Sequence, residues 1–419
     1  MPRFLEDADI KVLMLGARRV GKTSIVASMT SDTFLKKAVA GTDIELTVPK
    51  AGQEEVVDTF QSVVNMMVNY FDPKVPIKND NVKLDDQDLD TRTSLSTFKL
   101  DGAPSAKNMD FNVYLRTKNR GSTYKIQFID IPGEWIDSYR TSSTTNKDGS
   151  KTTLQDLAET ADVLMIVSDA VLLMEDNGQN SRIANKIDNI TSIIKDCVGA
   201  SSDKPEKLIM FTPAKCEVYF NRHMEMFKNT DPSRFHGDTD PMPVLMAQIQ
   251  KHYGELINYL TTGSNAKLYD VAILPILTLG NIEFSHIDPS SSNKPGSRVH
   301  SDMIYGYYKG DAFASGDFSS IYSADYMSVP EYAPQYCEQP LVMILLYQLS
   351  KLKKIKENRR WYARIGRRFF ELFGNLARDE ELLTNIPKLR RNLAVNTDGY
   401  LTTILQDPIS GVKGTTVQE

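Results

Sequence analysis

Residues 16–23 constrain the fold of this chain more than any other stretch, because their spacing is Gly-x-x-x-x-Gly-Lys-Thr. Residues 10–15, which precede them, form an apolar run with the length and composition of a buried strand. Residues 23–29, which follow, can continue as a helix. A strand, a glycine loop and a helix N-terminus in this order direct backbone N–H groups and the positive end of a helix dipole at a phosphate. The alternative is a tight turn that serves packing alone.

The residues of this loop have distinct expected roles. Lys22 would reach the β- and γ-phosphate oxygens of a nucleotide, and the Thr23 hydroxyl would bind Mg²⁺. Arg18 or Arg19 would contact the γ-phosphate as an internal arginine finger, or both would face solvent or pair with acidic neighbours. Lys22 and Arg18 are therefore candidate catalytic residues. The expected nucleotide-binding set at the loop is Gly16, Ala17, Arg18, Arg19, Val20, Gly21, Lys22, Thr23 and Ser24.

A second motif ends another expected strand. Residues 123–130 alternate as a strand does and end at Asp130, which is followed by Gly133 in an Asp-x-x-Gly pattern. Asp130 would hold Mg²⁺ together with Thr23. The Gly133 N–H would bond a γ-phosphate and move when that phosphate leaves. The pattern is common alone, but it is specific at the end of a strand downstream of a phosphate loop.

These two motifs resemble those of the P-loop GTPases of the Ras-like and translation-factor (TRAFAC) class. The run Asp-Ile-Pro-Gly-Glu-Trp that begins at Asp130 looks most like the bacterial YcjX-like and double-GTPase branch. The resemblance covers roughly residues 8–355. It implies a three-layer α/β fold with a mostly parallel sheet, GTP or GDP and Mg²⁺ as ligands, and a cytoplasmic switch protein. Further expected strands are residues 111–115 and 124–129, which form a hairpin around 118–121, and residues 161–167, 207–211 and 271–276.

The resemblance weakens at the base-recognition loop, where the family's Asn-Lys-x-Asp is replaced by residues 214–217, Ala-Lys-Cys-Glu. Lys215 would lie over the purine plane, and Glu217 would accept hydrogen bonds from guanine N1–H and N2–H₂. Lys215 and Glu217 make guanine the expected base. Ala214 cannot supply the amide that ties this loop to the phosphate loop in the family, and adenine therefore stays open as the alternative base. Residues 278–280 take the place of the small-residue loop beside the base.

Glu134 follows Gly133 at the position where many relatives carry a water-orienting Gln or His. A carboxylate there could polarise water, but the γ-phosphate would repel it. Glu134 is therefore a third candidate catalytic residue, with an open role.

The interval between the first helix and the second strand, residues 31–110, is far longer than in Ras-like proteins, and we interpret it as an insertion in switch I. Thr42 and Thr97 are the candidates for the threonine that closes on Mg²⁺. Residues 53–70 form an amphipathic pattern typical of a helix. A polar, loop-rich stretch near residues 283–334 is interpreted as a second insertion.

The chain has 419 residues, 41% of them hydrophobic, which supports a sizeable core. No apolar run approaches the ~18 residues of a membrane span, and no signal peptide is evident. Three scattered cysteines favour a reducing cytoplasm, and the scattered histidines show no zinc spacing. We expect a P-loop GTPase-like domain over residues 1–356, a basic helical extension over 357–395 and a flexible tail over 396–419.

The strongest charge feature is residues 351–368, with nine Lys or Arg and a single acid, Glu357. With its aromatic residues, the segment 351–373 would pack on the domain and leave solvated charges outside, bind a protein partner, or lie on an anionic membrane surface. Nucleic acid is the least favoured partner.

The sequence thus predicts a Mg²⁺-dependent GTP-binding switch protein with slow intrinsic hydrolysis. One rival is an ATP-binding P-loop NTPase, although the chain has no Leu-Ser-Gly-Gly-Gln signature. Another rival is a nucleotide-bound interaction module with little turnover.

Overall fold

The computed structural model describes residues 10–17, 20–50, 53–54, 57–58, 60–61, 64–65, 109–117, 120–145, 151–175, 179–198, 206–216, 242–278, 284–288, 304–307, 334–357, 380–395 and 402–412. Their core is an eight-stranded sheet with the order β12-β9-β8-β7-β1-β4-β3-β2. The five central strands are parallel to their neighbours, and β12, β3 and β2 pair antiparallel at the two sides. The chain is therefore an α/β protein with a mostly parallel sheet.

The strands are those that apolar runs predict. Every residue of β7 (Val163–Asp169) and β8 (Lys207–Ala214) is buried, as parallel strands covered on both faces require. The expected strand over residues 10–15 is confirmed as β1, and the expected hairpin is confirmed as β3 paired with β4. The other strands of the sheet are β1 (Ile10–Leu15), β2 (Ile44–Thr47), β3 (Met109–Thr117), β4 (Arg120–Asp130), β9 (Tyr269–Ile273) and β12 (Thr403–Gln406). Two small hairpins pair β5 (Ser143–Thr145) with β6 (Lys151–Thr153), and β10 (Phe284–Asp288) with β11 (Ile304–Tyr307).

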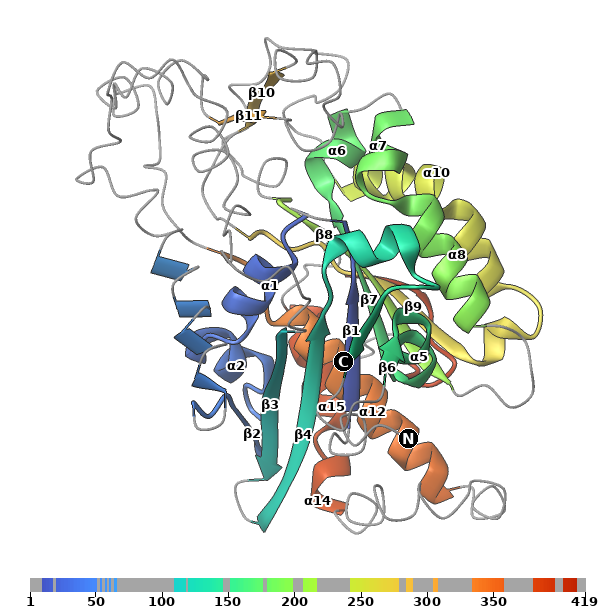
Figure 1. Cartoon of the computed structure of the whole chain (residues 1–419). Coiled ribbons are helices and arrows are strands. Elements are labelled where there is room, and N and C mark those ends of the chain that lie inside the picture. Colours follow the sequence, from blue (N-terminus) through green and yellow to red (C-terminus); the bar gives the residue numbers. More distant parts are fainter. Residues whose placement is uncertain are drawn as a thin grey trace.

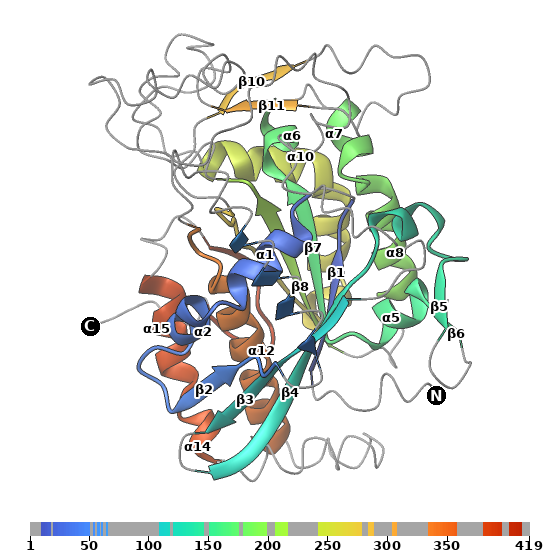
Figure 2. The same ribbon diagram turned by 60° about the vertical axis from the view of Figure 1, so that its left-hand side comes forward.

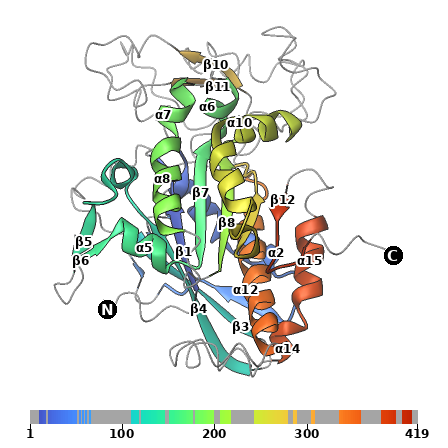
Figure 3. The same cartoon turned by 90° about the vertical axis from the view of Figure 1, so that its right-hand side faces the viewer.

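Helices cover both faces of the sheet, which gives three layers (Figures 1, 2 and 3). One face carries α5 (Leu154–Thr160), α8 (Ile187–Cys197) and α10 (Met242–Thr261). The other carries α1 (Lys22–Met29), α2 (Asp32–Ala38), α12 (Gln339–Glu357) and α15 (Ile386–Val395). The shorter helices are α6 (Ala170–Glu175), α7 (Gln179–Ala184) and α14 (Glu380–Leu383), with the 3₁₀ turns η2 (Gly133–Ser138) and η4 (Asn265–Lys267).

Helix α8 shows how sequence periodicity sets this layering. Its isoleucines recur at spacings of three and four residues, and Ile187, Ile190, Ile193 and Ile194 are buried against the sheet side. Each side chain buried in this way stabilises the fold by roughly 1.5–3 kcal/mol. The amphipathic pattern therefore fixes which side of α8 faces the core.

Part of the long interval after α1 belongs to the sheet. Strand β2 pairs with β3 so that Ile44 lies opposite Thr117, while Met109 at the other end of β3 lies opposite Asp130. Strand β2 therefore begins at the edge of the sheet away from Asp130. Described positions between residues 54 and 65 are helical, and the Phe60 ring contacts Phe111 edge to face at a centroid distance of 5.1 Å.

In the conformation described, this topology places Thr42 away from Asp130. Thr42 precedes β2 at the edge away from Asp130, and its hydroxyl donates to the Val39 carbonyl oxygen at 2.7 Å and accepts the Ile44 N–H at 3.2 Å. Its role is to close the turn that leads into β2. The other candidate, Thr97, and the acidic stretch 79–93 lie outside the described residues.

The expectation of a flexible tail over residues 396–419 is wrong for its described part, 402–412. Strand β12 pairs with β9, and Ile404 and Ile409 are buried. The Asp270 carboxylate accepts the backbone N–H groups of Ile409 and Ser410, each at 2.8 Å. The polar composition of this segment concealed its docking, because the contacts that anchor it come from residues distant in the sequence, such as Tyr269 and Asp270.

The first residue of the basic segment, Lys351, is also internal. Lys351 is 3% exposed, and its ammonium donates to the Glu206 carbonyl oxygen at 3.4 Å. Lys354 donates to the Pro408 carbonyl oxygen at 3.2 Å. Residues 358–379 lie outside the described residues. Among the helices that the structure describes, none combines the length and apolarity needed to cross a membrane.

The Asp270 contact gives a pH-dependent prediction. Burial raises the pKa of Asp270 to about 6 from an ordinary value of 3.8, against the hydrogen bonds from Ser410 and Ile409. Between about pH 4 and pH 6 the folded protein therefore binds more protons than the unfolded chain, and raising the pH lowers stability. We expect the unfolding free energy of wild type, relative to Asp270→Asn, to fall by about 2–3 kcal/mol from pH 4 to pH 7. Urea unfolding at each pH measures it, and a constant difference would contradict it.

Candidate functional site

The glycine loop lies between β1 and α1 and is pressed against the neighbouring strands. A Cβ added to Gly16 would lie 2.7 Å from the Val167 carbonyl oxygen on β7. Gly21, the N-cap residue of α1, has a left-handed φ of 101°, and a Cβ there would lie 3.3 Å from the Ala214 Cβ on β8. Steric contact with β7 therefore requires glycine at position 16, and backbone conformation favours glycine at position 21.

Lys22 is the first residue of α1 and is 8% exposed. Its ammonium donates to the carbonyl oxygens of Gly16, at 2.7 Å, and Ala17, at 3.0 Å. Burial lowers the pKa of Lys22, and the nearby carboxylates of Asp130 and Glu134 oppose that shift. The loop thus holds a largely desolvated cation at its centre.

The two residues expected to bind metal are in direct contact. The Thr23 hydroxyl, in the first turn of α1, donates to Asp130 Oδ2 at 3.1 Å. Asp130 ends β4, where it lies beside Met14 of β1. Burial raises the pKa of Asp130, although Lys22 and the Thr23 hydrogen bond pull it down. A carboxylate and a hydroxyl from two elements therefore converge beside the phosphate loop.

One atom at this point lacks a partner. Asp130 Oδ1 is buried and has no hydrogen-bond partner among the described residues. A buried carboxylate oxygen without a partner is costly, and it is a ligand that Mg²⁺ prefers. The residues present therefore fit a divalent cation held by Thr23 and Asp130.

The Asp-x-x-Gly segment continues into η2, which begins at Gly133. Gly133 is buried, whereas Glu134 is exposed and acts electrostatically on Lys22. Glu134 thus lies on the solvent side of the phosphate loop.

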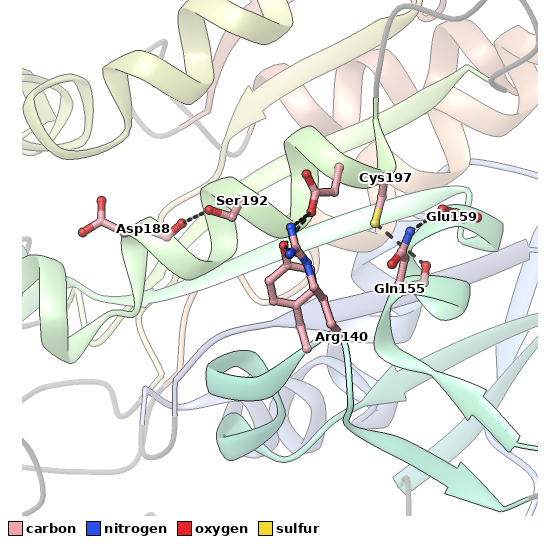
Figure 4. Close-up of polar contacts among 8 residues, drawn as sticks. Arg140, Gln155, Glu159, Asp188, Ser192 and Cys197 are labelled. Atoms are coloured by element: carbon pink, nitrogen blue, oxygen red, sulfur yellow. Dashed lines mark hydrogen bonds and ion pairs between the residues drawn. The ribbon is translucent and has the colours of Figure 1, made fainter.

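Helix α8 anchors the segment that follows Gly133. Asp137 forms an ion pair with Lys186 at 2.7 Å and accepts from the Asn189 amide at 3.2 Å. The Tyr139 hydroxyl donates to Asp196 Oδ2 at 2.5 Å, and Arg140 donates to the same oxygen at 3.1 Å. Figure 4 shows Arg140 reaching from this segment to α8. Polar contacts at the surface thus connect the Asp-x-x-Gly segment to one helix.

The expected base loop follows β8. Lys215 has a left-handed φ of 63°, and its ammonium donates to Asp169 Oδ2 at 2.6 Å. The Cys216 N–H donates to the Ile276 carbonyl oxygen at 3.2 Å, which connects this loop to the chain after β9. Thr278, the first residue of the expected small-residue loop, is buried.

The structure brings most of the predicted site residues to one edge of the sheet. Because β1, β4, β7 and β8 are parallel, their carboxyl ends meet there, and they carry the glycine loop, Asp130, Asp169 and Lys215. Arg18, Arg19 and Glu217 lie outside the described residues. Sequence reasoning missed Asp169, although an acidic residue ends β7 as Asp130 ends β4.

Comparison with known proteins adds little. No protein-family model matches the chain, and no curated protein matches it. Among solved structures, the chain is similar to the Ski7 GTPase-like domain of S. cerevisiae, described as bound to GTP, with 12% identity and a TM-score of 0.28. The match covers 66% of this chain and 44% of that one, so it spans less than half of the solved structure. At this identity and TM-score it assigns no role to any residue here.

The steric role of Gly16 can be tested against another glycine of the chain. Gly16→Ala would force the Val167 backbone aside, so we expect a loss of about 1–3 kcal/mol in unfolding free energy. Gly254, inside α10, is the control, because its Cβ would meet only the end of the Gln250 side chain. Gly254→Ala should be neutral or stabilise by up to about 1 kcal/mol. Denaturant unfolding measures both, and a Gly16→Ala protein as stable as wild type would refute the packing argument.

Proposed function

We propose that this protein binds a guanine nucleoside di- or triphosphate with Mg²⁺ at residues 16–23 and hydrolyses the triphosphate slowly. The observation that carries the proposal is the contact of Thr23 with Asp130 at 3.1 Å, beside the buried ammonium of Lys22. A hydroxyl, a carboxylate and a lysine at the N-terminus of a helix are the groups that P-loop proteins use for Mg²⁺ and phosphate.

The phosphate chain would be held by the loop and by Lys22. The backbone N–H groups at the start of α1 point toward the loop, and the helix dipole favours an anion there. The Lys22 ammonium, which donates to the Gly16 and Ala17 carbonyl oxygens, is proposed to contact the β- and γ-phosphates of a nucleotide in the loop. Gly133, buried at the start of η2, is the proposed γ-phosphate contact.

Thr23 and Asp130 would hold the metal, which when bound neutralises charge on the phosphate oxygens. Asp130 Oδ1, which has no partner among the described residues, is the atom that this assignment satisfies. Arg18 and Arg19 remain the proposed sources of a further positive charge at the γ-phosphate. Glu134 is proposed to orient the attacking water, because it is exposed and its charge reaches Lys22.

Guanine is the proposed base, and the grounds are Lys215 and Glu217 in the loop after β8. Ala214 has no polar side-chain group, but its Cβ lies close to Gly21, so packing brings this loop beside the phosphate loop. The ATP-binding rival uses the same phosphate site and differs only at the base.

The contacts between the Asp-x-x-Gly segment and α8 favour a switch role. They join partly exposed or exposed polar groups, so a movement of Gly133 would expose or cover Asp137, Asp196 and Lys186. A protein partner that reads this surface is therefore proposed. An interaction module with little turnover would use the same surface. Binding of the segment 351–373 to an anionic membrane remains a further proposal for its residues beyond Lys354.

Replacing one lysine tests the phosphate site directly. Lys22→Ala should reduce Mg²⁺-dependent binding of labelled GDP by at least about a hundredfold, since a buried charged contact to phosphate is lost. The control is Lys36→Ala, which removes an exposed lysine from the neighbouring helix α2 and should leave binding unchanged. Equal affinity of the two variants would refute the phosphate assignment.

The same wild-type protein distinguishes the rivals. Displacement of labelled GDP by GTP but not by ATP supports guanine, and displacement by ATP favours the ATP-binding rival. Phosphate release from GTP identifies a hydrolase, whereas tight binding without release identifies an interaction module.

A further inference from the structure

A buried carboxylate holds the lysine of the expected base loop. Lys215 Nζ lies 2.6 Å from Asp169 Oδ2, and the two side chains are 16% and 3% exposed. Asp169 ends β7 and Ala214 ends β8, and the two residues are paired in the sheet register. The ion pair therefore spans the carboxyl ends of two adjacent parallel strands.

Asp169 is fixed independently of Lys215. Its backbone N–H donates to the side-chain oxygen of Asn185 at 2.7 Å, and Asn185 is fully buried. Its other carboxylate oxygen accepts the Leu172 N–H, in the first turn of α6, at 3.2 Å. Because these contacts immobilise the carboxylate, Asp169 determines the position of the Lys215 ammonium.

Lys215 is also constrained at its backbone. It has a left-handed φ of 63°, which a lysine rarely adopts without support from its surroundings. The residue before it packs against Gly21 of the phosphate loop, and the N–H of the residue after it donates to Ile276. The root of the Lys215 side chain is therefore placed beside the phosphate loop, and its tip is placed at Asp169.

We propose that Asp169 is a positioning residue for the purine of the bound nucleotide, an inference that rests on the proposed function. With the ammonium held at Asp169, the four-carbon stem of Lys215 forms a fixed apolar surface beside the phosphate loop. A free lysine side chain would lose much rotamer freedom on contact with a base. The ion pair removes that loss before the nucleotide arrives, which is preorganisation of the base site.

This role predicts that a change at Asp169 lowers the affinity for a ligand that has a base and leaves the affinity for phosphate groups alone unchanged. Asp169→Asn keeps the shape of the side chain but removes the charge that holds Lys215. We expect it to weaken Mg²⁺-GDP binding about tenfold, as the loss of one charge-assisted contact does, and to change Mg²⁺-pyrophosphate binding by less than about twofold. Pyrophosphate is the probe because it has no base.

A double-mutant cycle separates positioning from structure. Lys215→Met removes the partner of Asp169, so adding Asp169→Asn to it should change GDP affinity by less than about twofold. The matched control is Asp43→Asn. It breaks the ion pair in which Lys388 Nζ lies 2.9 Å from Asp43 Oδ2, and it should change the affinity for neither GDP nor pyrophosphate. Melting temperatures check that each variant is folded.

Three results would overturn the proposal: equal weakening of GDP and pyrophosphate by Asp169→Asn, no weakening of either, or a full effect of Asp169→Asn in the Lys215→Met background. If Asp169→Asn does not fold, Lys215→Met decides the matter alone, since it should weaken GDP and spare pyrophosphate. A wild-type protein that binds neither GDP nor pyrophosphate would instead refute the proposed function itself.

Discussion

Lys22, which is buried, and Asp130, which is half-buried with one carboxylate oxygen fully buried, are opposite charges at one edge of the sheet. Neither could be buried alone without a large desolvation cost. Two loop carbonyl oxygens hold the lysine and the Thr23 hydroxyl holds the aspartate, yet Asp130 Oδ1 remains without a partner among the described residues. The proposed cation would supply the partner that Asp130 Oδ1 lacks among the described residues.

The same edge repeats this arrangement on the adjacent strands. Asp130 of β4 acts electrostatically on the lysine that follows β1, and Asp169 of β7 forms an ion pair with the lysine that follows β8. The first pair is proposed to serve phosphate and metal, and the second to serve the base. Parallel strands make this possible, because all their carboxyl ends open on one side of the sheet and bring side chains from distant segments together.

Much of the central fold follows from local pattern. The strand before the glycine loop, the helix after it and the strand that ends at Asp130 were each predictable, because an apolar run and a spacing motif specify them. Long-range pairing was not. The edge at which Thr42 lies depends on the register of β2 with β3, and the docking of residues 402–412 depends on Asp270, more than 130 positions earlier. Asp169 was missed because a single acidic residue becomes informative only when the structure shows that it is paired with Lys215.

The central claim is that Thr23 and Asp130 form a metal site that serves the phosphate loop. The most direct measurement is the affinity of labelled GDP with Mg²⁺ and with a chelator, in wild type and in Asp130→Asn. We predict that Mg²⁺ strengthens GDP binding to wild type by about tenfold or more, as one added charge-assisted contact would. The GDP affinity of Asp130→Asn should be the same with Mg²⁺ and with the chelator. Equal Mg²⁺ dependence in the two proteins, or none in wild type, would contradict the account.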